Sequence, residues 1–150
     1  MKDEEYMKIA IEEARKSSFP YGAVIVKDGE IIAKAGSGKI ENDPTAHAET
    51  TAVRRACSNL QTADLSGATI YCSCEPCLMC FGTLWWSNIR KIVYGANIKD
   101  SVADGICTFM KELNISINQL NSMSSNDFQI IDGICKEEAI EVMRNWQKNN

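Results

Sequence analysis

Two hydrophobic periodicities follow one another at the start of the chain. In residues 4–16 apolar side chains recur at helical spacing among charged neighbours, which predicts an amphipathic helix. Residues 22–35 carry β-branched runs on either side of Asp28-Gly29, a pair suited to the positive φ angles of a tight hairpin. We therefore expect a helix followed by two antiparallel strands.

A second helical pattern begins in the segment "DPTAHAE". Asp43 is a favourable N-cap and Pro44 a favourable first helical residue, so a helix is expected to start there. Its apolar stripe consists of Val53, Ala56, Cys57 and Leu60. One face of this helix is expected to be buried.

Strands and helices alternate in the remainder of the chain. The expected elements are a strand at 68–73, a helix at 76–86 opened by Pro76, a strand at 91–96, a helix near 101–113, a polar loop at 121–127, a strand at 128–132, and a last helix carrying Ala139, Val142, Met143 and Trp146. Strands separated by helices favour parallel pairing with right-handed crossovers. We expect an α/β fold, a three-layer αβα sandwich with a central sheet of five strands, forming one domain over residues 1–150.

Composition narrows the class of protein. With 150 residues, of which 45% are hydrophobic and 24% charged, the chain can bury the core of one domain. The formal net charge of -4 provides no basic field that would attract nucleic acid. Neither a signal peptide nor a long apolar run is recognisable, so a cytoplasmic protein without a membrane segment is expected. Seven cysteines without an export signal favour free thiols and a metal over disulfides.

The segment "EPCLMC" introduces the candidate chemistry. Cys77 and Cys80 lie three residues apart, so on a helix both sulfurs occupy one face, as a tetrahedral zinc requires. With Pro76 as the first helical residue, the pair lies at a helix N-terminus, where the dipole favours thiolate. Redox pairs share this spacing, but His47, the single histidine, supplies a third ligand. Three protein ligands leave one zinc position open, which is typical of a catalytic site.

Another interpretation of these residues remains open. Cys72 and Cys74 lie two apart on a predicted strand and so face one way, and with Cys77 and Cys80 they could form a closed structural zinc site. In that case His47 would be a structural histidine.

Glu49 is the candidate proton carrier. It lies four residues before Val53 and thus begins the apolar stripe of its helix, so its carboxylate is expected to face inward. Burial raises the pKa of a carboxyl group, which suits a residue that takes a proton from water and delivers it to a leaving amine.

Together, His47-Ala48-Glu49 and Pro76-Cys77-Leu78-Met79-Cys80 resemble the H-x-E and P-C-x-x-C motifs of the cytidine deaminase-like zinc deaminases. The resemblance extends over "FPYGAVIVKDGEII", "DPTAHAE", "CEPCLMCFGTL" and "IRKIVYGA", and is greatest to guanine and guanosine deaminases, yeast-type cytosine deaminase and tRNA adenosine deaminases. It implies a mixed five-stranded sheet, a homodimer, one Zn²⁺ per subunit held by His47, Cys77 and Cys80, and proton transfer by Glu49. It also implies substrate contacts from the Ala48 amide and the Glu75 carbonyl.

Other positions concern the substrate. Many relatives have an asparagine after the second strand, where this chain offers Ser37. Guanine deaminases share a Gly-Phe-Asp-Asp segment after the fourth strand, where this chain has "DGICTF", with Cys107 and Thr108 in place of the acids. This departure disfavours guanine and favours a smaller or different amino-heterocycle. Tyr21 matches a pocket-lining position, and Trp146 lies where relatives close the pocket with an aromatic residue.

Three functions follow as hypotheses. The first is a zinc hydrolase that releases ammonia from a free nucleobase or nucleoside, guanine-like, guanosine-like or cytosine-like. The second is a tRNA adenosine deaminase, which the acidic pI of about 5.1 and the acidic residues of the last helix disfavour. The third is a non-catalytic, zinc-stabilised binding module.

Overall fold

A computed structural model describes residues 2–108 and 110–150 of the chain. Its elements are, in chain order, α1 (Asp3–Arg15), β1 (Phe19–Lys27), β2 (Glu30–Ser37), α2 (Ala48–Leu60), β3 (Thr69–Cys74), α3 (Leu78–Trp86), β4 (Lys91–Ala96), α4 (Ile98–Val102), the 3₁₀ turn η1 (Ala103–Gly105), α5 (Ile117–Met123), β5 (Gln129–Ile131) and α6 (Lys136–Asn149). None of the helices in this part of the chain has the length and apolar character needed to cross a bilayer.

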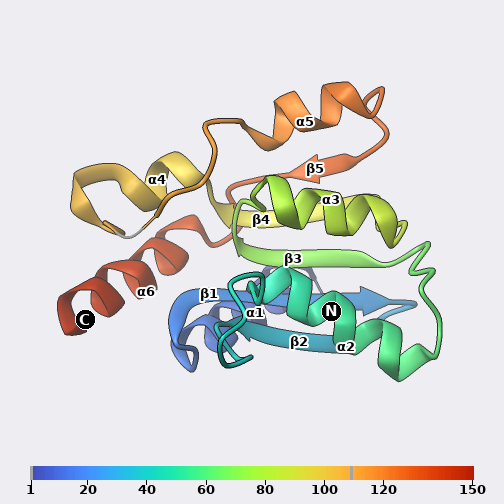
Figure 1. Cartoon of the computed structure of the whole chain (residues 1–150), viewed down its shortest axis with the longest axis horizontal. Helices are drawn as coiled ribbons and strands as arrows, with labels where there is room; N and C mark the ends of the chain where they lie inside the picture. Colours follow the sequence, from blue (N-terminus) through green and yellow to red (C-terminus); the bar gives the residue numbers. More distant parts are fainter. Residues whose placement is uncertain (1, 109) are drawn as a thin grey trace.

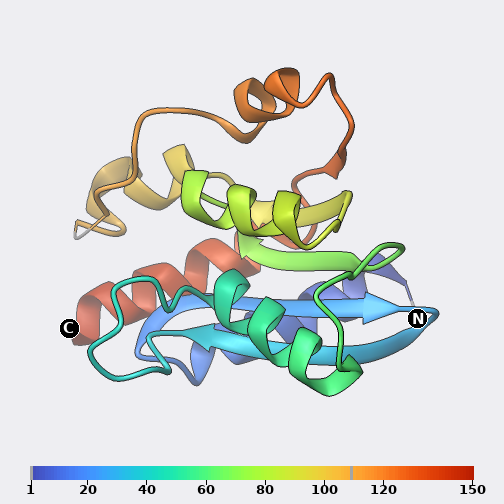
Figure 2. The same ribbon diagram turned by 45° about the vertical axis from the view of Figure 1, so that its right-hand side comes forward.

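The five strands form one mixed sheet in the order β2-β1-β3-β4-β5. β1 pairs antiparallel with β2 and β3, whereas β3, β4 and β5 run parallel. β2 and β3 run in the same direction, but β1 lies between them, so the connection through α2 passes over one strand. Figures 1 and 2 show helices on both sides of this sheet, which confirms the predicted three-layer architecture.

Each face of the sheet has its own hydrophobic core. Along β1, Ala23 and Ile25 belong to the core under α2 and α3, whereas Val24 and Val26 belong to the core under α1 and α6. Successive side chains of a strand point to opposite faces, so a continuous apolar run is needed when both faces are covered. This explains why the strands read as apolar runs rather than as alternating patterns.

Two local features of the N-terminal region have clear causes. Asp28 and Gly29 adopt φ angles of 51° and 77°, as the predicted hairpin turn requires. Gly22 allows α1 to approach β1 closely, since a Cβ at this position would lie 2.0 Å from the Ala10 carbonyl oxygen. The N-terminal helix and hairpin are therefore as predicted.

Both helix starts that frame the cysteine and histidine motifs were predicted too early. α2 begins at Ala48 with His47 as N-cap, not at Pro44 with Asp43 as N-cap. The Asp43 carboxylate accepts hydrogen bonds from the backbone and hydroxyl of Thr45, so it closes a turn of its own.

The same shift occurs before the next helix. Pro76 is not the first residue of α3, because Cys77 is its extended N-cap and Leu78 opens it. Proline suits an extended segment before a helix as well as its first turn, so its position did not decide between them. Leu60, expected on the buried stripe of α2, is 39% exposed at the helix end.

The helix predicted near 101–113 is also wrong for the described residues after Val102, and Phe109 lies outside the described residues. α4 ends at Val102, η1 follows, and Gly105 takes a left-handed φ of 71°, which stops a helix. In addition, part of the loop predicted at 121–127 is helical. Ser116 caps α5 through the Gln119 backbone, while the Gln119 side chain accepts from Ser116, a capping box that overrides the polar composition.

Candidate functional site

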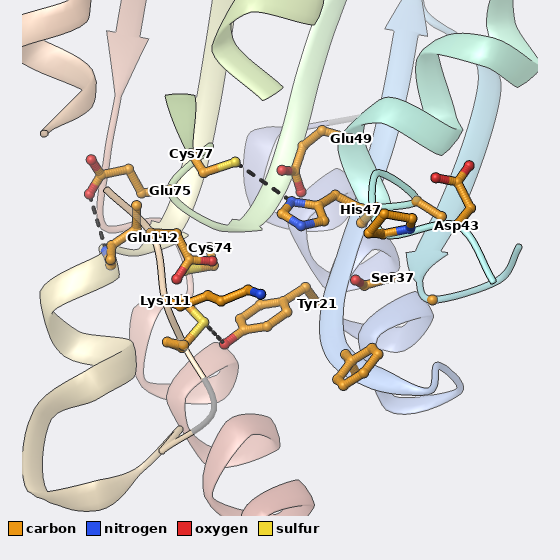
Figure 3. A pocket seen from close by; sticks show the side chains of 17 residues that line it. Tyr21, Ser37, Asp43, His47, Glu49, Cys74, Glu75, Cys77, Lys111 and Glu112 are labelled. Carbon is orange, nitrogen blue, oxygen red and sulfur yellow. Dashed lines mark hydrogen bonds between the residues drawn. The ribbon is translucent and has the colours of Figure 1, made fainter. Parts of the chain in front are cut away.

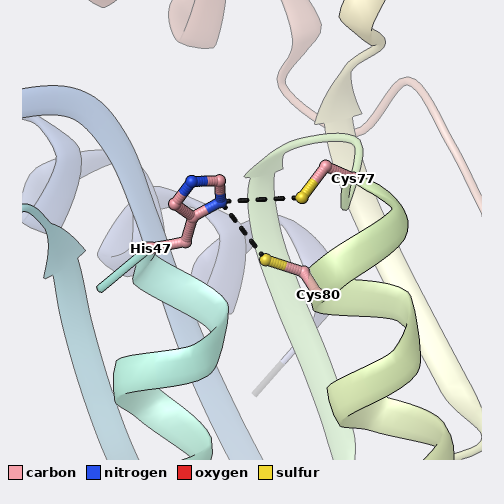
Figure 4. A group of neighbouring side chains, drawn as sticks. All are labelled: His47, Cys77 and Cys80. Atoms are coloured by element: carbon pink, nitrogen blue, oxygen red, sulfur yellow. Dashed lines mark hydrogen bonds between the residues drawn. The ribbon is translucent and has the colours of Figure 1, made fainter. Parts of the chain in front are cut away.

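The motif residues meet at one end of the sheet, where β3 ends and two helices begin. His47 and Cys77 are the N-caps of α2 and α3, and both have extended backbone angles that turn their side chains away from the helix body. Cys80 lies in the first turn of α3. In Figure 4 the His47 ring directs one nitrogen between the two sulfurs.

The distances among these side chains suit a tetrahedral zinc. His47 Nδ1 lies 3.6 Å from Cys77 Sγ and 3.5 Å from Cys80 Sγ, and all three ligand atoms lie within 4.8 Å of one another. Ligand bonds of about 2.3 Å to sulfur and about 2.0 Å to nitrogen, at tetrahedral angles, separate sulfur from nitrogen by roughly 3.6 Å. The donor set therefore fits zinc and leaves a fourth position for another ligand.

The three side chains shift one another's pKa values. Hydrogen bonds from Cys80 and His47 lower the pKa of the Cys77 thiol to about 4. The hydrogen bond with Cys77 in turn raises the pKa of His47 to about 9. The pKa of Cys80 is raised by its bond to Cys77 and by burial. Thus a thiolate is favoured at Cys77 even without a metal, which favours capture of a cation.

Glu49 lies beside this group and is almost fully enclosed. It is 6% exposed, and burial raises the pKa of its carboxyl group to about 7. A carboxyl group with a pKa near neutrality can both take up and release a proton at physiological pH. The sequence prediction that Glu49 faces inward is confirmed.

A cavity of about 290 Å³ opens in front of these residues. The predicted residues that line it are Tyr21, Ser37, His47, Ala48, Glu49, Glu75 and Cys77. Figure 3 labels all of these except Ala48 and shows the labelled side chains arranged around a common space. The structure therefore brings together most of the residues that the sequence singled out, from segments more than fifty residues apart.

Trp146 lies away from the cavity lining. Its indole nitrogen donates to the Ser18 carbonyl over 2.8 Å, and its ring packs against Phe19 at 5.7 Å between centroids. Phe19 itself lines the cavity, so Trp146 supports the wall from behind. A direct contact between Trp146 and a substrate stays a prediction.

The Glu75 side chain has a role that the sequence did not indicate. Its two carboxylate oxygens accept hydrogen bonds from the backbone of Ile98, at 3.2 Å, and of Ile117, at 2.8 Å. Glu75 therefore joins the end of β3 to the first residues of α4 and α5. A substrate contact from its carbonyl stays a prediction.

Among the cavity-lining residues that the sequence did not indicate are Met110, Lys111 and Glu112. One carboxylate oxygen of Glu112, Oε2, is buried without a hydrogen-bond partner among the described residues. These residues fall within the helix that the sequence predicts near 101–113. No motif or spacing distinguished them.

The alternative of a four-cysteine site receives no support from the arrangement. In the part of the chain that the structure describes, the group able to hold a metal consists of His47, Cys77 and Cys80. Cys72 is fully buried and Cys74 lines the cavity, and burial raises the pKa of both thiols well above the ordinary value. Both therefore behave as small apolar side chains.

Comparison with known families gives the site its context. The family described as "Cytidine and deoxycytidylate deaminase zinc-binding region" matches residues 1–96, which contain every residue of the His-Cys-Cys group and Glu49. The chain belongs to this family. The deaminase is thus a zinc-dependent hydrolytic enzyme by family, and the predicted cofactor is confirmed.

Relatives of the deaminase include two activities. A tRNA-specific adenosine deaminase of Bacillus subtilis (strain 168) is 46% identical over 143 residues, 91% of this chain and 83% of that protein. A guanine deaminase of the same organism is 47% identical over 87 residues, 57% of this chain and 56% of that protein. The longer alignment is with the tRNA enzyme.

Similar solved structures come from the same two kinds of enzyme. A guanine deaminase from Nitrosomonas europaea superposes with a TM-score of 0.82 and 25% identity, covering 97% of this chain and 84% of that one. A structure from a study of A-to-I editing by tRNA:A34 deaminases gives 0.77 and 32% identity, covering 92% and 98%. The predicted fold is therefore confirmed, and the substrate is left to the chemistry of the cavity.

Proposed function

We propose that the deaminase hydrolyses the exocyclic amine of an aminopurine, and that the substrate is a free base of the guanine type. His47, Cys77 and Cys80 are assigned as the zinc ligands on their mutual distances. A zinc ion held there supplies Lewis-acid activation of a water molecule near neutral pH.

Glu49 is assigned as the proton carrier. In hydrolytic deamination the water oxygen bonds to the ring carbon, the bond from that carbon to the exocyclic nitrogen breaks, and ammonia leaves. The net transfer moves a proton from water to the amine. Glu49 is buried beside His47, Cys77 and Cys80, here called the ligand group. With a pKa of about 7, its carboxyl group can both accept the proton from water and donate it to the amine.

The choice of substrate rests on one observation, the buried carboxylate of Glu112. Its Oε2 is buried without a hydrogen-bond partner among the described residues, and its side chain lines the cavity. A carboxylate accepts hydrogen bonds, and leaving one buried and unpaired costs about 1–3 kcal/mol or more. Guanine carries ring N–H donors that can satisfy this oxygen, whereas adenosine has no ring N–H. Glu112 therefore favours guanine over adenosine.

The cavity is also suited to a small molecule. Its volume is about 290 Å³, and Met110 and Lys111 line it together with Glu112, so residues from the second half of the chain cover what α2 and β3 leave open. Ser37 contributes a hydroxyl group in place of the asparagine of many relatives. The Ala48 N–H lies at the first helical position, where helix geometry supplies no acceptor and a substrate carbonyl can bind.

A second candidate is deamination of adenosine in tRNA. It is favoured by the comparison with the Bacillus subtilis tRNA enzyme, whose alignment covers 91% of this chain at 46% identity. Against it, the net charge of -4 provides little attraction for a polyanion. Glu112 would also have to face a ring without N–H donors.

One panel of substrates separates the two candidates. The zinc-loaded protein is incubated with guanine, guanosine, adenosine, cytosine, cytidine and a tRNA transcript, and ammonia release is measured for each. We expect turnover of guanine. Inosine formed in the tRNA with no ammonia from any free base would replace the first candidate by the second, and release from cytosine or cytidine alone would exclude both purine substrates.

A further inference from the structure

The cavity is closed on one side by an irregular segment, residues 106–108 and 110–116, here called the covering segment. It follows η1 and precedes α5, and it contributes Met110, Lys111 and Glu112 to the lining. Because it has no regular secondary structure in the described residues, its position depends on bonds to the rest of the molecule. Those bonds decide whether Glu112 reaches the cavity.

The two ends of this region are fixed by Glu75. Its carboxylate accepts from the Ile98 backbone, before the covering segment, and from the Ile117 backbone, after it. A third bond joins the Thr108 backbone to the side chain of Gln147 on α6. These contacts hold the flanks of the covering segment but not the residues that line the cavity.

Tyr21 reaches the middle of the segment from β1. Its hydroxyl donates to Met110 Sδ over 2.9 Å and lies 2.8 Å from the Ser101 hydroxyl of α4. A phenol has one proton to donate, so with that proton on Met110 the Ser101 hydroxyl is the donor to Tyr21. Figure 3 shows the Tyr21 hydroxyl bonded to the sulfur, with Lys111 running alongside.

The hydroxyl is suited to a permanent structural bond. Burial raises the pKa of Tyr21 far above its ordinary value, so the group stays protonated at physiological pH. It links a rigid strand of the sheet to α4 and to Met110, two residues before Glu112. Loss of this link would free the segment exactly where it faces the cavity, while both flanks stay attached.

We propose that the Tyr21 hydroxyl is a positioning group for the substrate: through Met110 and Ser101 it holds the covering segment, and with it Glu112, against the cavity. This inference rests on the proposed function for its kinetic consequence, but not for its structural one. The aromatic ring lines the cavity and packs in both hydrophobic cores, whereas the hydroxyl makes the link.

The test removes the hydroxyl alone, with Tyr21→Phe. Hydrogen exchange of peptides spanning residues 106–116 is measured by mass spectrometry, together with KM and kcat for the base that the wild-type protein deaminates. We expect faster exchange in these peptides, a KM raised about fivefold to tenfold from loss of the bonds to Met110 and Ser101, and a nearly unchanged kcat. Zinc content stays at the wild-type value, because no ligand is altered.

Tyr71→Phe is the matched control. The Tyr71 hydroxyl also donates to one partner, Asp3 of α1, at 2.7 Å. The Tyr71→Phe variant loses this hydrogen bond far from the covering segment. The exchange of residues 106–116 and the KM are therefore expected to stay at wild-type values. In the double variant Ser101→Ala with Tyr21→Phe, the changes in exchange and in KM are expected to be smaller than the sum of those in the single variants, since both substitutions break the same link.

The two possible failures have different signatures. If the wild-type protein deaminates no free base, the proposed function fails, and the exchange measurement still tests the positioning role. If Tyr21→Phe leaves both the exchange of residues 106–116 and the KM at wild-type values, the positioning role is overturned. Equal changes in Tyr71→Phe and Tyr21→Phe would also overturn it, because they would indicate a general loss of stability.

Discussion

Two carboxylates face the cavity from opposite sides, and their surroundings give them different chemistry. Glu49 lies in the first turn of α2, enclosed beside the ligand group, with its pKa raised to about 7 by burial. Glu112 comes from the covering segment and keeps one buried oxygen without a partner among the described residues. The first is suited to moving protons and the second to accepting hydrogen bonds from a ligand.

Replacing Glu49 by Gln separates catalysis from metal binding. We expect kcat to fall by about 10²–10⁴-fold, since the amide cannot take up a proton, while zinc content measured by mass spectrometry stays at one ion per chain. Unchanged turnover in the Gln variant would contradict the role of Glu49 and favour a non-catalytic zinc module or a different proton carrier.

Replacing Glu112 by Gln tests the choice of base. The loss of a charge-assisted hydrogen bond, about 1.5–3 kcal/mol, predicts a fall of about 10–100-fold in kcat/KM for guanine. Steady-state kinetics give the measurement, and Glu30→Gln, an exposed acid at the start of β2, serves as control. Wild-type kcat/KM for guanine in the Glu112 variant would remove the argument against an adenosine substrate.

At the scale of elements, the close contact between α1 and β1 depends on one missing side chain. Gly22→Ala places a Cβ 2.0 Å from the Ala10 carbonyl oxygen and 2.6 Å from the Ala14 nitrogen. Because both obstacles are backbone atoms, the helix must move. We expect the free energy of unfolding to fall by about 3 kcal/mol, measured by chemical denaturation.

Gly82→Ala is the control for this substitution. Gly82 lies within α3, and an added Cβ meets no atom within 4 Å. Alanine is favoured over glycine in a helix by about 1 kcal/mol, so this variant is expected to be as stable as the wild type or more so. Equal stability of the Gly22 and Gly82 variants would contradict the packing described for α1.

The elements themselves were largely predictable, because periodicity and turn chemistry are local properties. The hairpin at Asp28-Gly29 and the strands around the two motifs were read correctly from the sequence. The starts of α2 and α3 were not, since Pro44 and Pro76 fit an extended segment as well as a first helical turn. The difference matters, because it makes His47 an N-cap, from which its side chain can reach the neighbouring helix.

The covering segment was not predictable in the same way. A helix was expected near 101–113, but Gly105 with its positive φ ends the regular structure. Met110 accepts a hydrogen bond from Tyr21, 89 residues away in the sequence, and Glu75 bonds to Ile98 and Ile117 on either side of the covering segment. Such contacts are set by tertiary structure, so the residues that bear on the substrate were found only in the fold.

At the scale of the whole molecule, the ligand group brings together the starts of α2 and α3, which carry the histidine motif and the cysteine motif. His47 caps α2 and the cysteines lie at the start of α3, so a bound zinc links both helix ends over the edge of the sheet. A ligand that binds only the folded state stabilises it by mass action. The metal is therefore expected to stabilise the fold as well as to serve catalysis.

Removal of zinc by a chelator tests this link. We expect loss of activity and a decrease in Tm of about 10 °C, which corresponds to roughly 4 kcal/mol for zinc at about a thousand times its Kd. Differential scanning calorimetry gives the measurement. Added Zn²⁺ is expected to restore both properties and Mg²⁺ neither, because thiolates are poor ligands for a hard cation. An unchanged Tm after complete removal of zinc would contradict the link between the helices.

The homodimer and the cytoplasmic location stay predictions. Trp86 of α3 is 83% exposed and Leu78 of the same helix is 42% exposed, so this face has apolar area available to a second copy. Sedimentation analysis of the wild-type protein and of Trp86→Lys is expected to give a dimer and a weakened dimer. A wild-type monomer at all concentrations would contradict the prediction.

The most direct test of the account follows guanine and its product in one reaction. Zinc-loaded protein is mixed with guanine, and ammonia and xanthine are quantified over time. Hydrolytic deamination supported by Glu49 and Glu112 predicts equal amounts of ammonia and xanthine, with the Glu49→Gln protein inactive at full zinc content. Guanine left unchanged by a protein that holds its zinc would contradict the account.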